Sequence, residues 1–272
     1  MRESGTMKTL RARELGVSRS TLYYHPKQPE KDWMLKCCIE EVLRLHPSYG
    51  SRRIALHLKL NRKGVKRVMN LFGIKAYRRR GKKWKRTTNI KVIYPNLLLT
   101  TYPTYEGHIW ATDFTYLPFR GRFVYVATVI DLYTRKIVGL SVYTTHAVSL
   151  VLSALMSALH QNARPGIFHS DNGSEYNSAV FTNALTTVGS AISRSAPGCP
   201  WENGYQESFY NQFKIDLGDP SRFQSLGELV FAVYQTIYVY NHSRIHGVLK
   251  MSPVEFARQE GNATISSYKI HV

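Results

Sequence analysis

The chain has 272 residues, of which 43% are hydrophobic and 12% aromatic, so it has material for a packed core and is not an intrinsically disordered protein. Its 37 Lys and Arg residues exceed its 18 Asp and Glu residues, a formal net charge of +19, which predicts a partner with dense negative charge and disfavours a purely metabolic enzyme. Three cysteines cannot form a disulfide framework, and we recognise neither a membrane span nor a secretion signal, so we expect a cytoplasmic protein that does not bind membranes.

The positive charge is concentrated near the N-terminus. Residues 1–100 contain 25 basic and 6 acidic side chains, whereas residues 101–272 contain 12 of each. The densest run, residues 75–86, has eight basic side chains with Tyr77 and Trp84 between them. This run is either a solvated linker or a segment that follows a nucleic-acid backbone, and we favour the second interpretation. The asymmetry predicts a phosphate-binding N-terminal part and a different role for the remainder.

The N-terminal part is predicted to be helical. Residues 15–24 contain a glycine turn and a serine N-cap of the kind that begins a recognition helix. Two short helices are predicted over Ser51–Lys59 and Lys63–Phe72, and Gly73 is placed to end the second. Two amphipathic helices around a tight turn, with a cationic outer face, are typical of a helix-turn-helix that places one helix in a major groove.

From residue 108 the pattern changes to that of a mixed sheet. Three antiparallel strands are predicted, and helices and short strands then alternate. The strands cover His108–Leu117, Phe123–Tyr133 and Lys136–Thr145. After them come a helix over 148–159, a strand at 167–169, a helix over Ser178–Val188, a strand over Ala191–Ser195 and a helix over Trp201–Leu217. This order predicts a mixed sheet with helices on its faces.

Three acidic residues occupy unusual places in these elements. Asp113 lies in the middle of a strand, where a carboxylate is disfavoured unless it is paired or binds a cation. Asp171 follows a strand, at the edge where sheets of this kind place functional groups. Glu207 lies on the third helix of this half. If the three converge, their repulsion raises their pKa values until divalent cations sit between them.

The helix that carries Glu207 is predicted to have one packing face and one reactive face. Residues four apart share a face, so Tyr205, Phe209 and Phe213 are expected to be buried. The other face is expected to carry Asn203, Glu207, Asn211 and Lys214. Oxygen ligands suit Mg²⁺ or Mn²⁺ rather than zinc, and two such ions about 4 Å apart can support an in-line phosphoryl displacement.

The motifs around these acids resemble the D,D-35-E core of retroviral integrases and of insertion-sequence transposases, most closely the OrfB type. Thirty-five residues separate Asp171 from Glu207. The resemblance rests on Trp110-x-x-Asp113-x-Thr115-Tyr116, Val129-Ile130-Asp131-Leu132-Tyr133-Thr134-Arg135-x-Ile137-Val138-Gly139, His169-Ser170-Asp171-x-Gly173-Ser174-x-Tyr176, Glu207-Ser208-Phe209, Tyr240-Asn241-x-x-Arg244-x-His246 and Ser252-Pro253-x-x-Phe256. In the basic part, Tyr49-Gly50-x-Arg52-Arg53-Ile54, Arg67-Val68-Met69 and Gly73-Ile74 match the preceding helix-turn-helix, so the resemblance covers about 45–257.

The resemblance implies a ribonuclease-H-like core with a five-stranded mixed sheet that cleaves and joins DNA at the ends of a mobile element. Asp113 would bridge two Mg²⁺ ions, Asp171 would complete one site and Glu207 the other, with Mn²⁺ as a substitute. A released 3′-hydroxyl would attack a phosphodiester directly. The implied partners are terminal repeats, target DNA, further copies of the chain as a homo-oligomer on DNA and a frameshift partner encoded upstream, in the bacterial cytosol and at the nucleoid when DNA is bound.

The predicted organisation has four parts. These are a helix-turn-helix region at 1–75, a basic linker at 76–104, the catalytic core at 105–220 and a helical extension at 221–272. Side chains expected to contact DNA are Arg52, Arg53, Lys63, Lys66, Arg67, Arg78, Arg79, Arg80, Lys82, Lys83, Asn203, Asn211 and Lys214.

Other interpretations stay open. The chain could be a DNA-binding regulator or remnant with a silent core, or a ribonuclease-H-like nuclease that acts on hybrids or junctions. A zinc site is disfavoured because the spacing of Cys37, Cys38, His46 and His57 fits no zinc template. We expect His169 to orient its neighbours rather than bind a metal, and Asp131 to be structural. Surface positions are expected for Asp216, Asp219 and Glu228.

Overall fold

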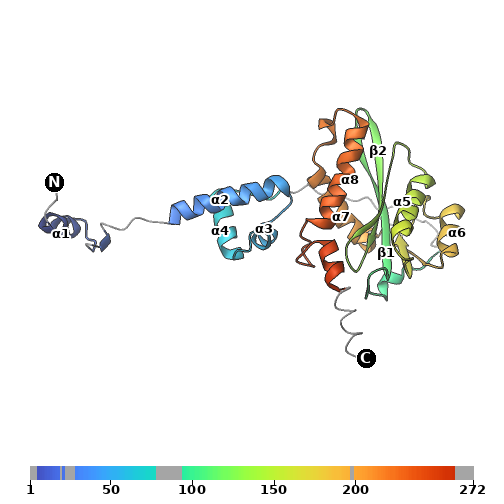
Figure 1. Cartoon of the computed structure of the whole chain (residues 1–272), viewed down its shortest axis with the longest axis horizontal. Coiled ribbons are helices and arrows are strands. Elements are labelled where there is room, and N and C mark those ends of the chain that lie inside the picture. Colours follow the sequence, from blue (N-terminus) through green and yellow to red (C-terminus); the bar gives the residue numbers. More distant parts are fainter. Residues whose placement is uncertain (1–4, 19, 22–27, 78–93, 197–198, 261–272) are drawn as a thin grey trace, which may run out of the picture.

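The computed structural model describes residues 5–18, 20–21, 28–77, 94–196 and 199–260 (Figure 1). Four helices lie in the basic part: α1 (Gly5–Glu14), α2 (Gln28–Leu45), α3 (Ser51–His57) and α4 (Arg62–Leu71). The last two confirm the pair expected from sequence, and α2 is an addition. Residues 19 and 22–24 of the segment expected to begin a recognition helix lie outside the described residues. The Ser18 hydroxyl accepts the Thr21 N–H as an N-cap would.

Helices α2, α3 and α4 share a small core, and we call them the N-terminal helical unit. Val65, Val68 and Met69 of α4 pack against buried side chains of α2 and α3, including Ile39 and Ile54. The Asn61 side chain accepts the Lys63 N–H at 2.8 Å and begins α4. Gly73 ends the unit with a positive φ of 65°, a backbone conformation that glycine adopts without strain.

The sheet has five strands in the order β3-β2-β1-β4-β5. Strands β1 (Ile109–Phe119), β2 (Arg122–Asp131) and β3 (Ile137–Tyr143) are antiparallel, and β4 (Ile167–Ser170) and β5 (Ala191–Arg194) run parallel to β1. The predicted mixed five-stranded sheet is therefore confirmed, with strand ends within about two residues of those expected from sequence.

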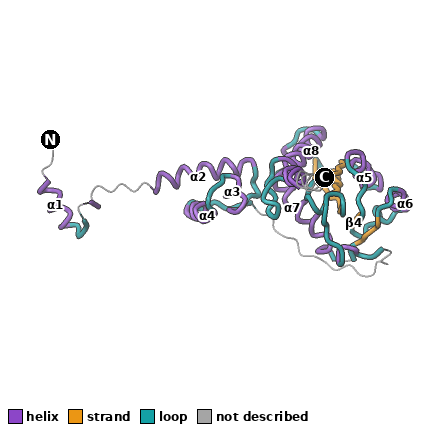
Figure 2. The backbone as a smooth tube through the Cα atoms, turned by 60° about the horizontal axis from the view of Figure 1, so that its bottom comes forward, coloured by secondary structure: helices purple, strands orange, loops and turns teal. Residues whose placement is uncertain are grey.

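Helices cover both faces of the sheet (Figures 1 and 2). Helices α5 (Val148–Gln161) and α6 (Ala179–Thr187) lie on one face, and α7 (Gly204–Leu217) and α8 (Leu226–His242) lie on the other. Successive residues of β2 enter different cores: Val126 and Ile130 pack on the α7–α8 side, and Ala127 and Val129 on the α5–α6 side. The continuous apolar run predicted for this strand is thus explained by burial on both faces.

The α5 layer approaches the sheet closely at Gly139. A Cβ atom built there would lie 2.3 Å from the Ala154 carbonyl oxygen and 2.8 Å from the Ala158 Cβ. Short 3-10 helices at Leu97–Leu99, Pro200–Asn203 and Pro220–Arg222 connect larger elements of the described chain. None of the described helices is both long and apolar enough to span a membrane.

The region after residue 220 packs onto the sheet. Leu229, Val233 and Ile237 of α8 are buried in the same core as α7. Farther along, Ile245 packs against the N-terminal helical unit, and its N–H is donated to the Tyr49 hydroxyl at 2.7 Å. The C-terminal region therefore contacts both the sheet and the basic helices, and the four domain boundaries stay a prediction.

Candidate active site

Asp113 lies in the middle of β1 and is half-buried. Its Oδ1 accepts the N–H of Phe114 at 2.8 Å. Burial, together with the negative charges of Asp171 and Glu207, raises the pKa of this carboxyl to about 8, although the Phe114 N–H and Lys214 act to lower it. A carboxyl in this condition carries a proton that a nearby cation would displace.

The sheet places Asp171 beside Asp113. Ala111 of β1 pairs with His169 of the parallel strand β4, so Asp113 and Asp171 each stand two residues beyond a paired position on neighbouring strands. The Oδ1 atom of Asp171 accepts the Gly173 N–H at 3.1 Å. Burial raises the pKa of Asp171, and the nearby Glu175 adds to that rise.

Glu207 lies in the first turn of α7, where its side chain is exposed. Three side chains on or next to this helix hold it against β1 at the level of Asp113. Gln206 donates to the Ala111 carbonyl at 2.7 Å, Asn203 to the Thr112 carbonyl at 3.3 Å and the Tyr210 hydroxyl to the Asp113 carbonyl at 2.6 Å. Buried bonds of this kind fix the helix position relative to the strand.

The three acids interact electrostatically but do not form a finished metal cage. Within the described ranges, no group of three His, Cys, Asp or Glu side chains is close enough to hold a metal ion. The chemistry of the donor set nevertheless fits a hard divalent cation, because it consists of carboxylate oxygens that raise the pKa of Asp113. Two of these carboxylates follow from the sheet register, and the third extends from α7 into solvent.

The prediction for the two faces of α7 is partly wrong. Phe209 and Phe213 are buried as expected, but Tyr205 is 40% exposed. Asn203 is 6% exposed and precedes the helix, so it does not share an exposed face with Glu207. The reason is that residues 200–203 form a 3-10 turn, which shifts the helical register that was expected to begin at Trp201.

The structure separates the residues expected to contact DNA into several groups. Exposed side chains include those of Arg52, Lys63, Lys66 and Asn211. Arg67 is bonded to both carboxylate oxygens of Asp32, one at 2.6 Å. Lys214 lies over the Tyr116 ring, 5.2 Å from its centroid. Outside the described residues lie Arg78, Arg79, Arg80, Lys82 and Lys83.

A polar network that the sequence analysis missed joins the N-terminal helical unit to α7 and the segment after α8. Asp216, expected at the surface, accepts from Ser48 at 2.9 Å and pairs with Arg244 at 2.7 Å. Arg53 donates to Gln212 at 3.2 Å. The prediction for Asp216 is wrong because its partners come from 168 residues earlier and 28 residues later in the chain, which no local pattern reveals.

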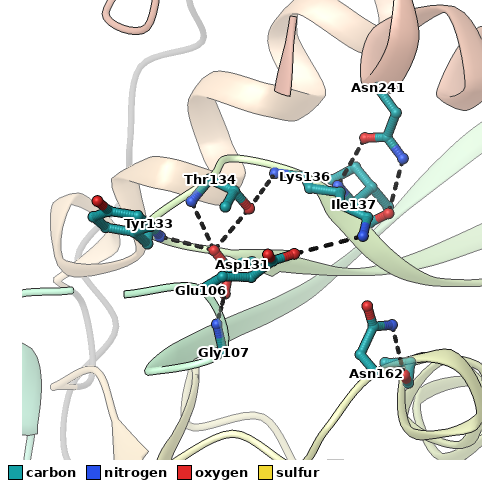
Figure 3. Close-up of polar contacts among 10 residues, drawn as sticks. Glu106, Gly107, Asp131, Tyr133, Thr134, Lys136, Ile137, Asn162 and Asn241 are labelled. Atoms are coloured by element: carbon teal, nitrogen blue, oxygen red, sulfur yellow. Dashed lines mark hydrogen bonds and ion pairs between the residues drawn. The ribbon is translucent and has the colours of Figure 1, made fainter. Parts of the chain in front are cut away.

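The structural interpretation of Asp131 is confirmed, and the surroundings of His169 are polar. Asp131 is fully buried and accepts backbone N–H groups from Gly107, Tyr133 and Thr134 (Figure 3). Both ring nitrogens of His169 are within hydrogen-bond distance of serine hydroxyls, at 2.8 Å for Ser193 and 3.2 Å for Ser195. Asp131 therefore belongs to the scaffold around the acids, and the expectation that His169 does not bind a metal stays a prediction.

Comparison with known proteins gives a consistent family. Residues 103–200 and 188–253 each match a family model described as an integrase core domain. The chain is 32% identical over 244 residues to the transposase for insertion sequence element IS904 of Lactococcus lactis subsp. lactis. This alignment covers 85% of this chain and 96% of the relative. It is 29% identical over 278 residues to the transposase for insertion sequence element IS629 of Shigella sonnei, with 93% and 92% covered.

The fold also matches a solved structure. A chain of the simian T-cell lymphotropic virus intasome, in complex with PP2A regulatory subunit B56 gamma, superposes with a TM-score of 0.50. The match covers 77% of this chain and 70% of that chain at 16% identity. At this identity the likeness concerns the fold.

Proposed function

The chain belongs to the insertion-sequence transposases with an integrase core domain and is a DNA transposase, and we propose that Asp113, Asp171 and Glu207 are its catalytic residues. The observation that carries this proposal is the environment of Asp113. Burial and two neighbouring carboxylates raise its pKa to about 8. Acidic side chains with strongly shifted pKa values cluster at functional sites.

The chain's own residues supply positioning and charge. Asp113 and Asp171 present oxygens from neighbouring strands, and the three hydrogen bonds from α7 and its entry hold the helix that carries Glu207 against β1. We propose that these carboxylates hold Mg²⁺, for which Mn²⁺ can substitute, because hard oxygen donors favour those ions. A bound divalent ion stabilises the negative charge that develops during phosphoryl displacement.

The basic helices complete the proposal. Arg52, Lys63 and Lys66 are exposed on the N-terminal helical unit, and we propose that they bind phosphates at the ends of the element and at target DNA. Joining two DNA ends requires two active sites in one complex, so we propose a homo-oligomer on DNA. An upstream frameshift partner stays a sequence-based expectation.

The test is Mg²⁺-dependent joining of a labelled duplex that carries the element's terminal sequence. We expect Asp113→Asn to lower joining by roughly a thousandfold or more, since a metal-bound carboxylate contributes several kcal/mol to the transition state. Asp219→Asn is the matched control, because Asp219 is an exposed cap whose function asparagine retains. Equal joining by wild type and Asp113→Asn would remove the catalytic assignment, and wild-type binding without joining would favour a silent regulator.

A further inference from the structure

A cavity of about 190 Å³ lies where the N-terminal helical unit meets the catalytic core. Its lining comes from α3, from β2 and the turn that follows it, from α7, and from α8 and the segment after it. Among the described residues, this lining includes three arginines and no Asp or Glu; the arginines are Arg53, Arg135 and Arg244. We call it the arginine cavity.

The arginine cavity has more positively charged side chains than carboxylates to pair with them. Arg244 is paired with Asp216 at 2.7 Å, and Arg53 donates to the neutral Gln212. The Nε and Nη1 atoms of Arg135 are buried and have no hydrogen-bond partner among the described residues. A buried charged donor without an acceptor is costly, so the geometry favours an anion in this space.

The Arg135 guanidinium is held in place before any ligand arrives. Its φ of 63° is in the left-handed region, which strains a non-glycine residue. The turn around it is fixed by the bonds to Asp131 and by Asn241, whose side chain bonds both the N–H and the carbonyl of Ile137 (Figure 3). The guanidinium lies 4.2 Å from the centroid of the Tyr205 ring. Such preorganisation lowers the entropic cost of binding.

The arginines also affect the protonation of His246, which lines the same cavity. Burial, together with the positive charges of Arg135, Arg53, Arg244 and Lys250, lowers the pKa of His246 to about 4. Its imidazole is therefore neutral at physiological pH, so the lining keeps a positive potential that comes from guanidinium groups. Guanidinium groups match phosphate oxygens in geometry as well as charge.

We propose that the arginine cavity binds a phosphate group of the DNA backbone and so anchors substrate DNA at the junction between the N-terminal helical unit and the catalytic core. Ser208, exposed on α7, lines the cavity one residue after Glu207, so the cavity borders the helix that carries this proposed catalytic acid. The inference rests on the proposed role of Glu207, and its test measures binding without Mg²⁺, so the failure of one proposal is distinguishable from that of the other.

The first experiment uses inorganic phosphate as the probe. Thermal unfolding of the full chain is compared in sodium phosphate and in sodium chloride at equal ionic strength. We expect phosphate to raise the midpoint of wild type and to leave that of Arg135→Gln unchanged. Arg120→Gln is the control, because Arg120 is exposed and has a similar left-handed φ of 46° in the turn between β1 and β2. The control should respond to phosphate as wild type does.

The second experiment measures DNA affinity by fluorescence anisotropy over a range of KCl concentrations. Loss of one phosphate contact lowers the slope of log affinity against log salt by about 1, so we expect that decrease for Arg135→Gln and a smaller one for Arg120→Gln. Ser208→Glu is a second variant that places a carboxylate at the cavity. It should raise the midpoint of the protein in chloride, remove the response to phosphate and lower the salt slope.

Each other outcome overturns the proposal. Equal changes of the salt slope in Arg135→Gln and Arg120→Gln would show that the decrease reflects the loss of any positive charge and not of a contact in the cavity. Phosphate stabilisation with an unchanged DNA slope would assign the cavity to free phosphate instead of the DNA backbone. If phosphate does not raise the midpoint of wild type, and Ser208→Glu changes neither the midpoint in chloride nor the salt slope, the cavity holds water alone. This result decides the matter even if Arg135→Gln fails to fold.

Discussion

The regions around Asp131 and Asp113 show how two enclosed aspartates on adjacent strands acquire different roles. Asp131 accepts three backbone N–H groups and the Thr134 hydroxyl, all between 2.7 and 3.0 Å. Asp113 accepts the N–H of Phe114 and faces two further acids, which raise its pKa. The first carboxylate is satisfied by donors and organises a turn, whereas the second retains a need for positive charge. Local donors, and not burial alone, separate a structural acid from a reactive one.

The largest expected effect on stability is at Asp131. Asp131→Ala leaves three buried backbone N–H groups and one hydroxyl without their acceptor, and we expect it to lower the free energy of unfolding by about 3–5 kcal/mol. Urea unfolding followed by circular dichroism measures the change. Asp113→Asn affects only one recognised donor, the Phe114 N–H, so it should lower the free energy of unfolding much less. A comparable loss in both variants would erase the distinction between the two regions.

The second prediction concerns pH. The pKa of Asp113 is about 8 in the folded chain, against 3.8 ordinarily, so the folded state holds a proton that the unfolded state releases between these values. The stability from this group is therefore fully present below pH 4 and is lost as the pH rises towards 8, by at most about 1.4 kcal/mol per pH unit. Urea unfolding of wild type in EDTA at pH 5, 6, 7 and 8 should show this decline. Asp113→Asn should show a flatter profile, and parallel profiles would contradict the protonated state.

The smallest effect is expected at Thr134. Thr134→Val keeps the shape of the side chain and removes one hydroxyl donor to Asp131, 2.8 Å away. We expect a loss of about 1 kcal/mol in the free energy of unfolding, because the backbone donors remain. Thr182→Val, on an α6 residue whose hydroxyl bonds only local helix carbonyls among its recorded contacts, is the control and should change stability less. A neutral Thr134→Val would show that the turn does not need its hydroxyl.

Much of the fold follows from local sequence patterns. The alternating and continuous apolar runs of 108–145 predict β1, β2 and β3, and the periodicity of Val65, Val68 and Met69 predicts α4. Helix α2 was missed because its apolar positions are broken by exposed Trp33 and Met34, which obscure the helical period. The entry to α7 was misplaced because a 3-10 turn satisfies the same local propensities as a helical turn.

The candidate site was predictable in part for the same reason. An acid in mid-strand and an acid after a parallel strand are unusual enough to be recognised individually, as with Asp113 and Asp171. Arg135 could not be recognised in this way, since an arginine in a turn is ordinarily expected to be solvated. Its significance depends on Arg53 and Arg244, which come from distant parts of the chain. Contacts over such separations are set by tertiary packing.

The hydrogen bond from Ile245 to the Tyr49 hydroxyl spans 196 residues, which has a consequence for biosynthesis. At about 5–20 residues per second, the ribosome delivers Ile245 roughly 10–40 s after Tyr49. The helices that emerge first thus receive their last packing partner only after the whole catalytic sheet has been translated. A prematurely terminated product would carry an incomplete version of this unit, so the packing of the N-terminal helices is completed only together with that of the sheet.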